Sequence, residues 1–144
     1  MIRKAELKDV EAIVALGVEF GEQSKSIHTL NVCPKTIWKT VCSALEYPDS
    51  AVLLVAEDEK GVAGVIYGVA CKTFFSDEIV LQELAWYSQR KVFGFALFKA
   101  LEAEARLRGI KKIVVGSKPA FFDLRKVYEK WGYKLLEEQF IKEI

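Results

Sequence analysis

Histidine is nearly absent from this sequence, which has 144 residues and a single histidine, His28. A metal site built from several histidines is therefore excluded, and a serine–histidine–aspartate triad would depend on this one residue. His28 lies in a segment without helical or strand periodicity. We expect it to be a surface or lid residue rather than a catalyst, and we expect no bound metal.

Cysteine is also scarce, and long apolar runs are missing. The three cysteines, Cys33, Cys42 and Cys71, form an odd set without metal-site spacing, which favours reduced, mostly buried thiols. No apolar run approaches the length of a membrane span, and the first residues lack the apolar core of a signal peptide. We therefore expect a cytoplasmic protein with no membrane partner.

Neither sign of charge is in excess. Lys and Arg number 21 and Asp and Glu number 20, so the net charge of +1 gives no reason to expect a nucleic-acid partner.

What the sequence does contain is an even distribution of apolar residues, 51% of the total, without repeats or linkers. This composition predicts one compact domain over residues 1–144.

Four segments repeat apolar side chains at intervals of three and four residues, which predicts helices. The predicted helices cover residues 9–23, 34–45, 93–108 and 123–132. Pro34 suits the first turn of the second helix, and Gly109 suits the end of the third.

Six further segments are short apolar or alternating runs, which are typical of strands. The predicted strands cover residues 2–7, 51–57, 62–75, 78–87, 110–117 and 133–144. Tight connections between the second, third and fourth strands predict an antiparallel meander, and the crossover through the third helix favours a parallel pair. We therefore expect a mixed α/β (α+β) domain in the order β-α-α-β-β-β-α-β-α-β. It would have one mixed, mostly antiparallel central sheet of six to seven strands, flanked by about four helices.

The segment that joins the fourth strand to the third helix has the composition of an anion site. A helix N-terminus presents unpaired N–H groups and a partial positive charge, which suit a phosphate. Gln89, Arg90 and Lys91 stand just before this helix and can add donors and charge. Basic residues before a helix are more often a solvated turn, so this segment alone leaves both interpretations open.

The order of the predicted elements, this loop and a later tyrosine–glycine motif together resemble the GNAT superfamily of N-acetyltransferases. The acyl-CoA loop of that family reads Q/R-x-x-G-x-G/A. In the preferred register, Gln89 takes the first position, Val92 the first glycine and Gly94 the second. A rival register begins at Lys91 and uses Gly94 and Ala96.

The chain departs from the family pattern in three places. First, Val92 replaces a glycine, and its β-branched side chain resists the backbone angles that glycine permits. Second, the connection after Trp86 is short and lacks a proline. Third, Phe121 replaces an asparagine. Such a degenerate loop is expected to weaken pyrophosphate binding without abolishing it. The resemblance is closest to a short branch encoded by bacteriophages and prophages, which shares "ELAWY" and an E-x-x-F-x-K ending, here residues 137–142.

The resemblance implies acetyl-CoA as co-substrate. The backbone of the fourth strand would pair with the pantetheine, helped by a bulge or splay that frees its N–H and C=O groups. The implied cofactor-binding residues are Ala85, Trp86, Gln89, Arg90, Lys91, Val92, Phe93, Gly94 and Phe95.

The resemblance also implies two catalytic residues. Tyr128 matches the tyrosine of the family's Y-x-x-x-G-F/Y motif, and a phenol that is protonated at neutral pH can act as general acid. The alternative interpretation is that Tyr128 only packs on its helix, with its hydroxyl at the rim. Glu83 is the candidate base, on the same strand face as Leu81 and Ala85, where burial would raise its pKa. The alternative interpretation is that Glu83 forms a salt bridge with a Lys or Arg.

The implied activity is direct acetyl transfer to a primary amine of a small molecule or protein, and a homodimer is compatible with it. Glu19, Glu22 and His28 could face the amine, although a solvated helix face explains them equally well. The main alternative is a catalytically impaired GNAT scaffold that serves as a binding or structural protein, in a phage particle or against a host protein. Exposed phenylalanines would then mark a partner surface, or line a cofactor cleft or dimer interface: Phe74, Phe75, Phe121 and Phe122. An unrelated mixed domain is the third interpretation.

Overall fold

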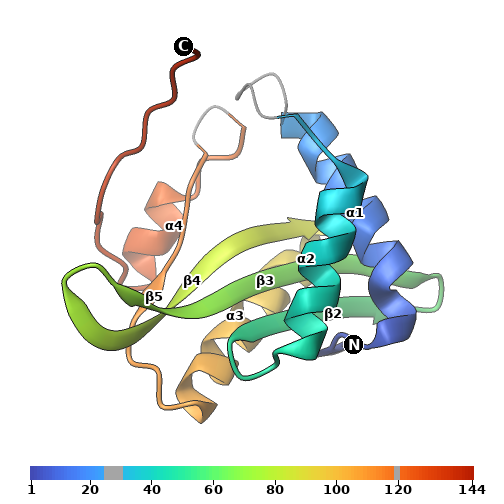
Figure 1. Cartoon of the computed structure of the whole chain (residues 1–144), viewed down its shortest axis with the longest axis horizontal. Coiled ribbons are helices and arrows are strands. Elements are labelled where there is room, and N and C mark those ends of the chain that lie inside the picture. The colour runs from blue at the N-terminus through green and yellow to red at the C-terminus, as the bar shows by residue number, and fades with distance from the viewer. Residues whose placement is uncertain (25–30, 119–120) are drawn as a thin grey trace.

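The computed structural model describes residues 1–24, 31–118 and 121–144, and a five-stranded sheet runs through this part of the chain (Figure 1). The strands lie in chain order, antiparallel except for the last pair, which is parallel. They are β1 Ile2–Lys4, β2 Ala51–Asp58, β3 Gly61–Thr73, β4 Ser76–Ser88 and β5 Ile113–Val114. The predicted meander and parallel crossover are therefore confirmed.

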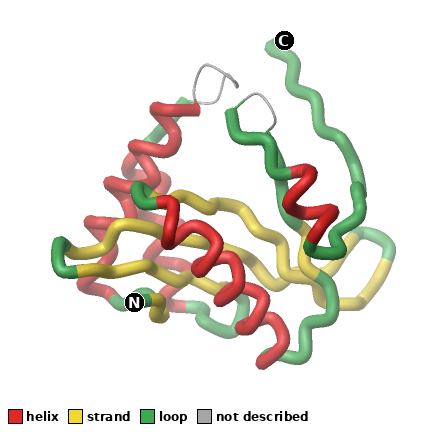
Figure 2. The backbone as a smooth tube through the Cα atoms, turned by 180° about the vertical axis from the view of Figure 1, so that it is seen from behind, coloured by secondary structure: helices red, strands yellow, loops and turns green. Residues whose placement is uncertain are grey.

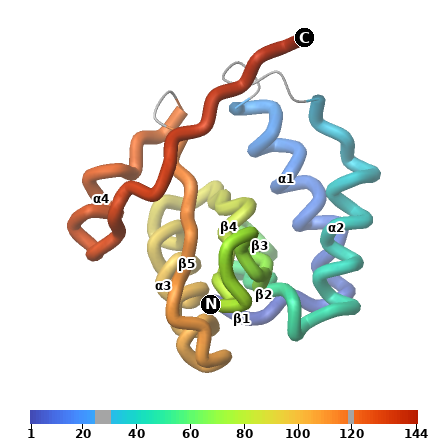
Figure 3. Tube along the Cα trace, turned by 60° about the vertical axis from the view of Figure 1, so that its left-hand side comes forward, coloured from blue at the N-terminus to red at the C-terminus, as the bar shows by residue number. Residues whose placement is uncertain are grey.

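Helices cover both faces of the sheet, as the view from behind and the rotated view show (Figures 2 and 3). They are the 3₁₀ helix η1 Leu7–Asp9 and the α-helices α1 Val10–Ser24, α2 Pro34–Glu46, α3 Lys91–Leu107 and α4 Arg125–Lys130. Alternation along β2 divides the core: Leu53 and Val55 pack with α1 and α2, while Leu54 and Ala56 pack with α3 and α4. Because β2 is buried on both faces, its sequence is a continuous apolar run.

The four predicted helices are confirmed with shifted ends. The third begins at Lys91, two residues earlier than predicted, and the first strand is shorter because the chain turns into η1 after Lys4. Gly109 ends α3 as expected: its φ is +70°, and the following N–H of Ile110 donates to the carbonyl of Ala105.

The prediction of a closing strand over residues 133–144 is wrong, and so is the expected count of six to seven strands. In the part of the chain that the structure describes, β5 shortens to two residues and residues 133–144 join no sheet. Tyr133 accounts for this, because it is held against α3 and α4: its hydroxyl donates to Glu102 at 2.8 Å and its N–H to the carbonyl of Tyr128 at 2.9 Å. The chain therefore leaves α4 away from the edge of β5.

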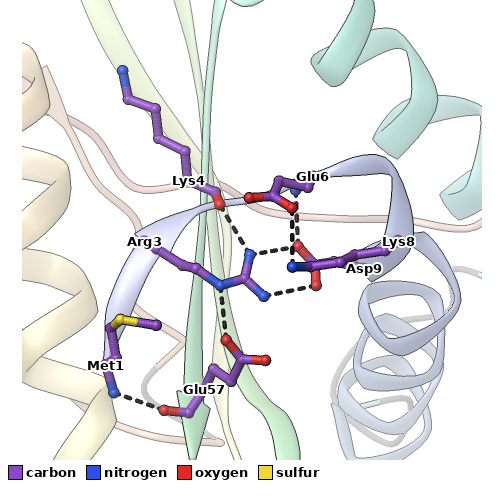
Figure 4. Close-up of polar contacts among 7 residues, drawn as sticks. All are labelled: Met1, Arg3, Lys4, Glu6, Lys8, Asp9 and Glu57. Atoms are coloured by element: carbon purple, nitrogen blue, oxygen red, sulfur yellow. Dashed lines mark hydrogen bonds and ion pairs between the residues drawn. The ribbon is translucent and has the colours of Figure 1, made fainter.

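An ion cluster ties the first strand to the first helix and to β2 (Figure 4). The guanidinium of Arg3 donates to both carboxylate oxygens of Asp9, at 2.7 and 2.9 Å, and to Glu57 at 2.8 Å. Asp9 is only 4% exposed and also accepts the N–H of Glu6. The hydrogen bonds from Arg3 hold the pKa of Asp9 below its ordinary value.

We expect Asp9→Asn to lower the free energy of unfolding by about 2 kcal/mol at neutral pH, because it removes a charged acceptor of Arg3. The pKa of Asp9 is lower in the folded than in the unfolded chain, so this stabilisation is present above about pH 4 and is lost as the pH falls through the folded pKa. Urea unfolding at several pH values measures the difference. Glu11→Gln, at an exposed position in the first turn of α1, is the matched control, and equal effects of the two substitutions would contradict the prediction.

Candidate active site

The candidate site lies where β4 loses its second neighbour. β4 pairs with β3 along nearly its whole length, but β5 pairs only with Leu81 and Gln82. Beyond Gln82 the chain after β5 rises away from β4 (Figure 1). Among the described residues no strand covers this edge of β4 from Glu83 to Ser88, so its backbone can accept an extended ligand.

A β-bulge lies at the same point. Tyr67 of β3 is opposite Ala85 and Gly68 is opposite Glu83, so Leu84 is an extra residue on β4. Residues directly opposite share a face of the sheet, so Ala85 lies on the face of Tyr67, towards α1 and α2, and Glu83 on the other. The prediction that Glu83 and Ala85 share a face is therefore wrong, because simple alternation ignores the bulge.

Helix α3 starts directly beside the open edge of β4. Arg90 is its N-cap residue, and the N–H of Phe93 already donates to the carbonyl of Arg90 at 3.0 Å. The N–H groups of Lys91 and Val92 belong to the first turn, where no preceding helical carbonyl exists to accept them. This turn, with the positive end of the helix dipole, suits an anion.

Val92 does not strain the helix start. Among the described residues, positive φ angles occur only at glycines, so Val92 takes an ordinary helical conformation. Its side chain is 75% exposed, while Phe93 packs against the core. The backbone at residue 92 therefore needs no glycine-specific angles in this structure, while the expected weakening of pyrophosphate binding stays a prediction.

Two of the three predicted polar donors are already paired. The amide Nε2 of Gln89 donates to Glu19 at 2.6 Å, and the Nε of Arg90 lies 2.9 Å from Asp58. Lys91 is exposed, and within the described parts of the chain its ammonium has no ion-pair partner. An anion at the helix start would therefore meet Lys91 as the available side-chain cation.

Trp86 joins the open strand to the helix start. Its indole Nε1 donates to the carbonyl of Gly94 at 3.0 Å, and its ring packs at a tilt against Phe98 with centroids 4.9 Å apart. Phe95 lies next to Trp86 and packs edge-on against Trp131. These contacts fix the open edge of β4 relative to the first turn of α3.

The two predicted catalytic residues meet at one backbone residue, Gly116. A carboxylate oxygen of Glu83 accepts the N–H of Gly116 at 3.3 Å, and the hydroxyl of Tyr128 donates to the carbonyl of Gly116 at 2.9 Å. Tyr128 is buried between Phe98 and Tyr133 rather than placed at a rim. The part of the chain that follows β5 therefore brings both groups to the place where β4 and β5 separate.

Burial shifts the pKa of both groups upwards. Burial raises the pKa of the Glu83 carboxyl, while the N–H of Gly116 and the charge of Lys118 oppose this rise. Burial, followed by the charge of Glu83, raises the pKa of the Tyr128 phenol. A carboxylate with a raised pKa is a stronger base, and a phenol with a raised pKa stays protonated at neutral pH.

An aromatic cluster from α1 lies beside this site and was not predicted from the sequence. Phe20 packs against Tyr87 at 5.5 Å and edge-on against Phe121 at 5.9 Å, and the ammonium of Lys118 lies 4.8 Å from the ring centroid of Phe20. Tyr87 donates to Glu19 at 2.8 Å. Phe20 lies on the apolar stripe of α1. Its spacing in the sequence is that of a buried core residue, so sequence analysis did not identify it as a site residue. Of the other acceptor-side candidates, Glu22 has partners, and His28 lies outside the described residues.

A cavity lies elsewhere in the described residues, away from the predicted site. A cavity of about 890 Å³ lies at the far end of α3, where Glu104 pairs with both Lys4 and Arg108. None of the predicted site residues lines it. Within residues 1–24, 31–118 and 121–144, no three His, Cys, Asp or Glu side chains gather to hold a metal. None of the helices in these ranges is both long and apolar enough to span a membrane.

Comparison with known proteins supports the architecture. Neither a model of a known protein family nor a curated protein matches the chain. A possible acetyltransferase from Clostridium difficile 630 superimposes with a TM-score of 0.78 at 15% identity, covering 100% of this chain and 97% of that one. A predicted acetyltransferase from Clostridium acetobutylicum, crystallised with acetyl-CoA, gives 0.75 at 18% identity, covering 99% and 95%. Glucosamine-6-phosphate N-acetyltransferase from Arabidopsis thaliana gives 0.73 at 18%, covering 99% and 97%. At these identities the likeness establishes the GNAT-like fold.

We expect Lys118→Met to raise the pKa of Glu83 further, because the positive charge of Lys118 favours the ionised carboxyl. NMR titration of the side-chain carboxyl carbon measures this pKa. Lys112→Met is the matched control, because the ammonium of Lys112 pairs with Glu78 at 2.7 Å and not with Glu83. A Glu83 pKa that stays constant or falls in Lys118→Met would show that the two groups do not interact.

Proposed function

We propose that this chain is an acetyl-CoA-dependent N-acetyltransferase that moves an acetyl group directly to a primary amine. One observation carries the proposal: the uncovered edge of β4 runs into the first turn of α3, and Glu83 and Tyr128 converge beside it on Gly116. The solved acetyltransferases of the same fold, one of them with acetyl-CoA, support it.

The main chain would hold the acetyl-CoA. The pantetheine would lie along the edge of β4 at Ala85 and Trp86, and the diphosphate in front of the first turn of α3 at Lys91 and Val92. The uncovered edge and the exposed Val92 fit this requirement, because no strand of the described residues pairs with β4 there and the Val92 side chain is not packed against the core. Since these donors are backbone groups, replacing a glycine by Val92 removes none of them.

The reaction then needs one base and one acid. Glu83, directly or through a water, takes a proton from the ammonium of the acceptor, and the free amine nitrogen attacks the thioester carbonyl. The C–N bond forms, the nitrogen gives up its second proton to solvent, the C–S bond breaks, and the coenzyme A thiolate leaves with the electron pair. Tyr128 donates its phenolic proton to this thiolate, and the resulting phenolate is reprotonated from solvent. The raised pKa of Tyr128 keeps the proton in place until the thiolate develops.

The alternative is a GNAT-shaped scaffold that no longer binds the cofactor. Two observations favour it: Phe121 packs on Phe20 at the position of the family's asparagine, and Gln89 and Arg90 are paired with carboxylates. Both observations concern side chains at the margin of the loop. The backbone groups that the proposal needs are not affected by them.

We expect Tyr128→Phe to lower kcat for acetyl transfer by about 100-fold, because the departing thiolate loses its proton donor, while the Kd of acetyl-CoA changes little. Release of the free thiol, followed with a chromogenic disulfide and a panel of amines, measures kcat. Tyr133→Phe is the matched control: it removes a hydroxyl from the same cluster, one bound to Glu102, and should leave kcat unchanged. Equal losses in the two variants would indicate a packing effect and argue against an acid role for Tyr128.

We expect Val92→Gly to leave the Kd of acetyl-CoA nearly unchanged, because the backbone at residue 92 is helical and its side chain points to solvent. The same substitution should lower the free energy of unfolding by about 0.5–1 kcal/mol, since glycine is a poorer helix former. Isothermal titration calorimetry and urea unfolding measure the two quantities. A large gain in affinity would instead identify a loop that has decayed, and would favour the scaffold interpretation.

A further inference from the structure

One lysine of the chain lies beside the candidate active site. Lys118 follows closely after Gly116, the residue on which Glu83 and Tyr128 converge. Lys118 is exposed, and in the part of the chain that the structure describes its ammonium forms no ion pair. The ammonium lies instead 4.8 Å from the ring centroid of Phe20. The chain therefore holds a primary amine of its own next to the two groups that acetyl transfer requires.

The contact between Lys118 and Phe20 reaches across the gap beside β4. Lys118 belongs to the chain that follows β5, and Phe20 belongs to α1. The chain that follows β5 and helix α1 lie on opposite sides of β4 (Figures 1 and 3). Phe20 packs against Tyr87, near the end of β4, with ring centroids 5.5 Å apart. The ammonium on the ring of Phe20 is therefore placed at the uncovered edge of β4, beside the proposed position of the pantetheine.

Hydrogen bonds anchor the backbone at Lys118. Its carbonyl accepts the N–H groups of Phe121 and Phe122, each at 2.8 Å. The hydroxyl of the preceding Ser117 accepts the N–H of Leu124, the N-cap residue of α4, at 3.0 Å. Because the backbone is held in this way, the torsions of the lysine side chain alone decide where its ammonium lies.

Two attractions hold the ammonium at the site. The face of the Phe20 ring attracts a cation. The positive charge of Lys118 also favours the ionised form of Glu83, so these two groups interact. The other lysines that follow α3 lie elsewhere: Lys112 is paired with Glu78 at 2.7 Å, and Lys111 lines the cavity at the far end of the helix.

We propose that Lys118 is a modification site, at which the chain transfers the acetyl group of acetyl-CoA to its own Nζ atom. The proposal rests on the proposed function, because it uses the same base and the same acid. Glu83 takes a proton from the ammonium of Lys118, and the free nitrogen attacks the thioester carbonyl. The C–N bond forms, the nitrogen gives up its second proton to solvent, the C–S bond breaks, and the coenzyme A thiolate leaves with the electron pair. Tyr128 protonates this thiolate and is itself reprotonated from solvent.

Acetylation converts the ammonium of Lys118 into a neutral amide. The amide lacks the positive charge that favours the ionised form of Glu83. The fully acetylated protein should therefore show the same rise in the pKa of Glu83 as Lys118→Met does in the NMR titration. An unchanged pKa after complete modification would place Lys118 away from Glu83 and overturn the proposal.

Incubation with acetyl-CoA alone, in a buffer free of primary amines, tests the transfer directly. Peptide mass spectrometry follows each lysine over time, with acetyl-CoA in excess. We expect Lys118 to gain an acetyl group with a first-order rate constant that does not depend on protein concentration, because the transfer is intramolecular. Lys111, an exposed lysine at the far end of α3, is the internal control for uncatalysed acetylation. Equal rates at the two lysines, or a rate constant that rises with protein concentration, would contradict self-acetylation.

Two pairs of variants separate catalysis from simple exposure. Tyr128→Phe should slow the acetylation of Lys118 by about 100-fold, because the thiolate loses its proton donor, whereas Tyr133→Phe should not slow it. Phe20→Leu should slow it by about threefold, because the ring that attracts the ammonium is removed. Phe75→Leu, at an exposed position in the turn between β3 and β4, should leave the rate unchanged. If Tyr128→Phe is modified as fast as the wild type, the lysine reacts without catalysis and the proposal is wrong.

Calorimetric titration of the wild-type protein with acetyl-CoA separates this proposal from the proposed function. If acetyl-CoA binds but Lys118 is acetylated no faster than Lys111, self-acetylation alone is wrong and the proposed function stands. If acetyl-CoA does not bind, the proposed function fails, and self-acetylation fails with it.

Discussion

The parting of β4 from β5 is the constraint on which the rest of this structure depends. β4 has two neighbours at Leu81 and Gln82 and one neighbour from Glu83 onwards, and the bulge at Leu84 falls next to this change. A bulge bends a strand and increases its twist, so it helps β4 turn away from the chain that follows β5. Trp86, bonded to the carbonyl of Gly94, then holds the start of α3 against the open edge. The exposed backbone donors and acceptors thus result from the sheet, not from any particular loop sequence.

The same parting explains the electrostatics of the candidate site. Gly116 lies just beyond β5, and its two backbone groups bind Glu83 on one side and Tyr128 on the other. Tyr128 is buried there and Glu83 is half-buried, and this loss of hydration raises the pKa of each. A carboxylate with a raised pKa and a phenol that stays protonated are what acetyl transfer to an amine requires. The pair is therefore assembled by backbone geometry, while the aromatic cluster around Phe20 closes the side towards α1.

The features that depend on apolar periodicity and on turn residues could be predicted from the sequence. Helices, the antiparallel meander and the parallel crossover follow from apolar spacing and short connections, and Gly109 ends α3 as expected. Alternation could not predict the face of Ala85, because one inserted residue at Leu84 reverses it. The loop pattern places Val92 in a glycine position, whereas in the structure this residue lies inside α3, which begins at Lys91. Residues 133–144 were predicted as a strand from their apolar residues, but a strand needs a partner edge, and Tyr133 is bound to Glu102 of α3 at the point where this segment begins.

The central claim is that backbone groups of β4 and α3 form an acyl-CoA site, and amide NMR during titration with acetyl-CoA tests it most directly. The account predicts that the largest saturable shifts belong to the amides of Ala85, Trp86, Lys91 and Val92, on the open edge and the helix start. Amides lining the cavity at the far end of α3, such as that of Ile110, should stay in place. No saturable shift at millimolar acetyl-CoA, or shifts confined to that far cavity, would contradict the account.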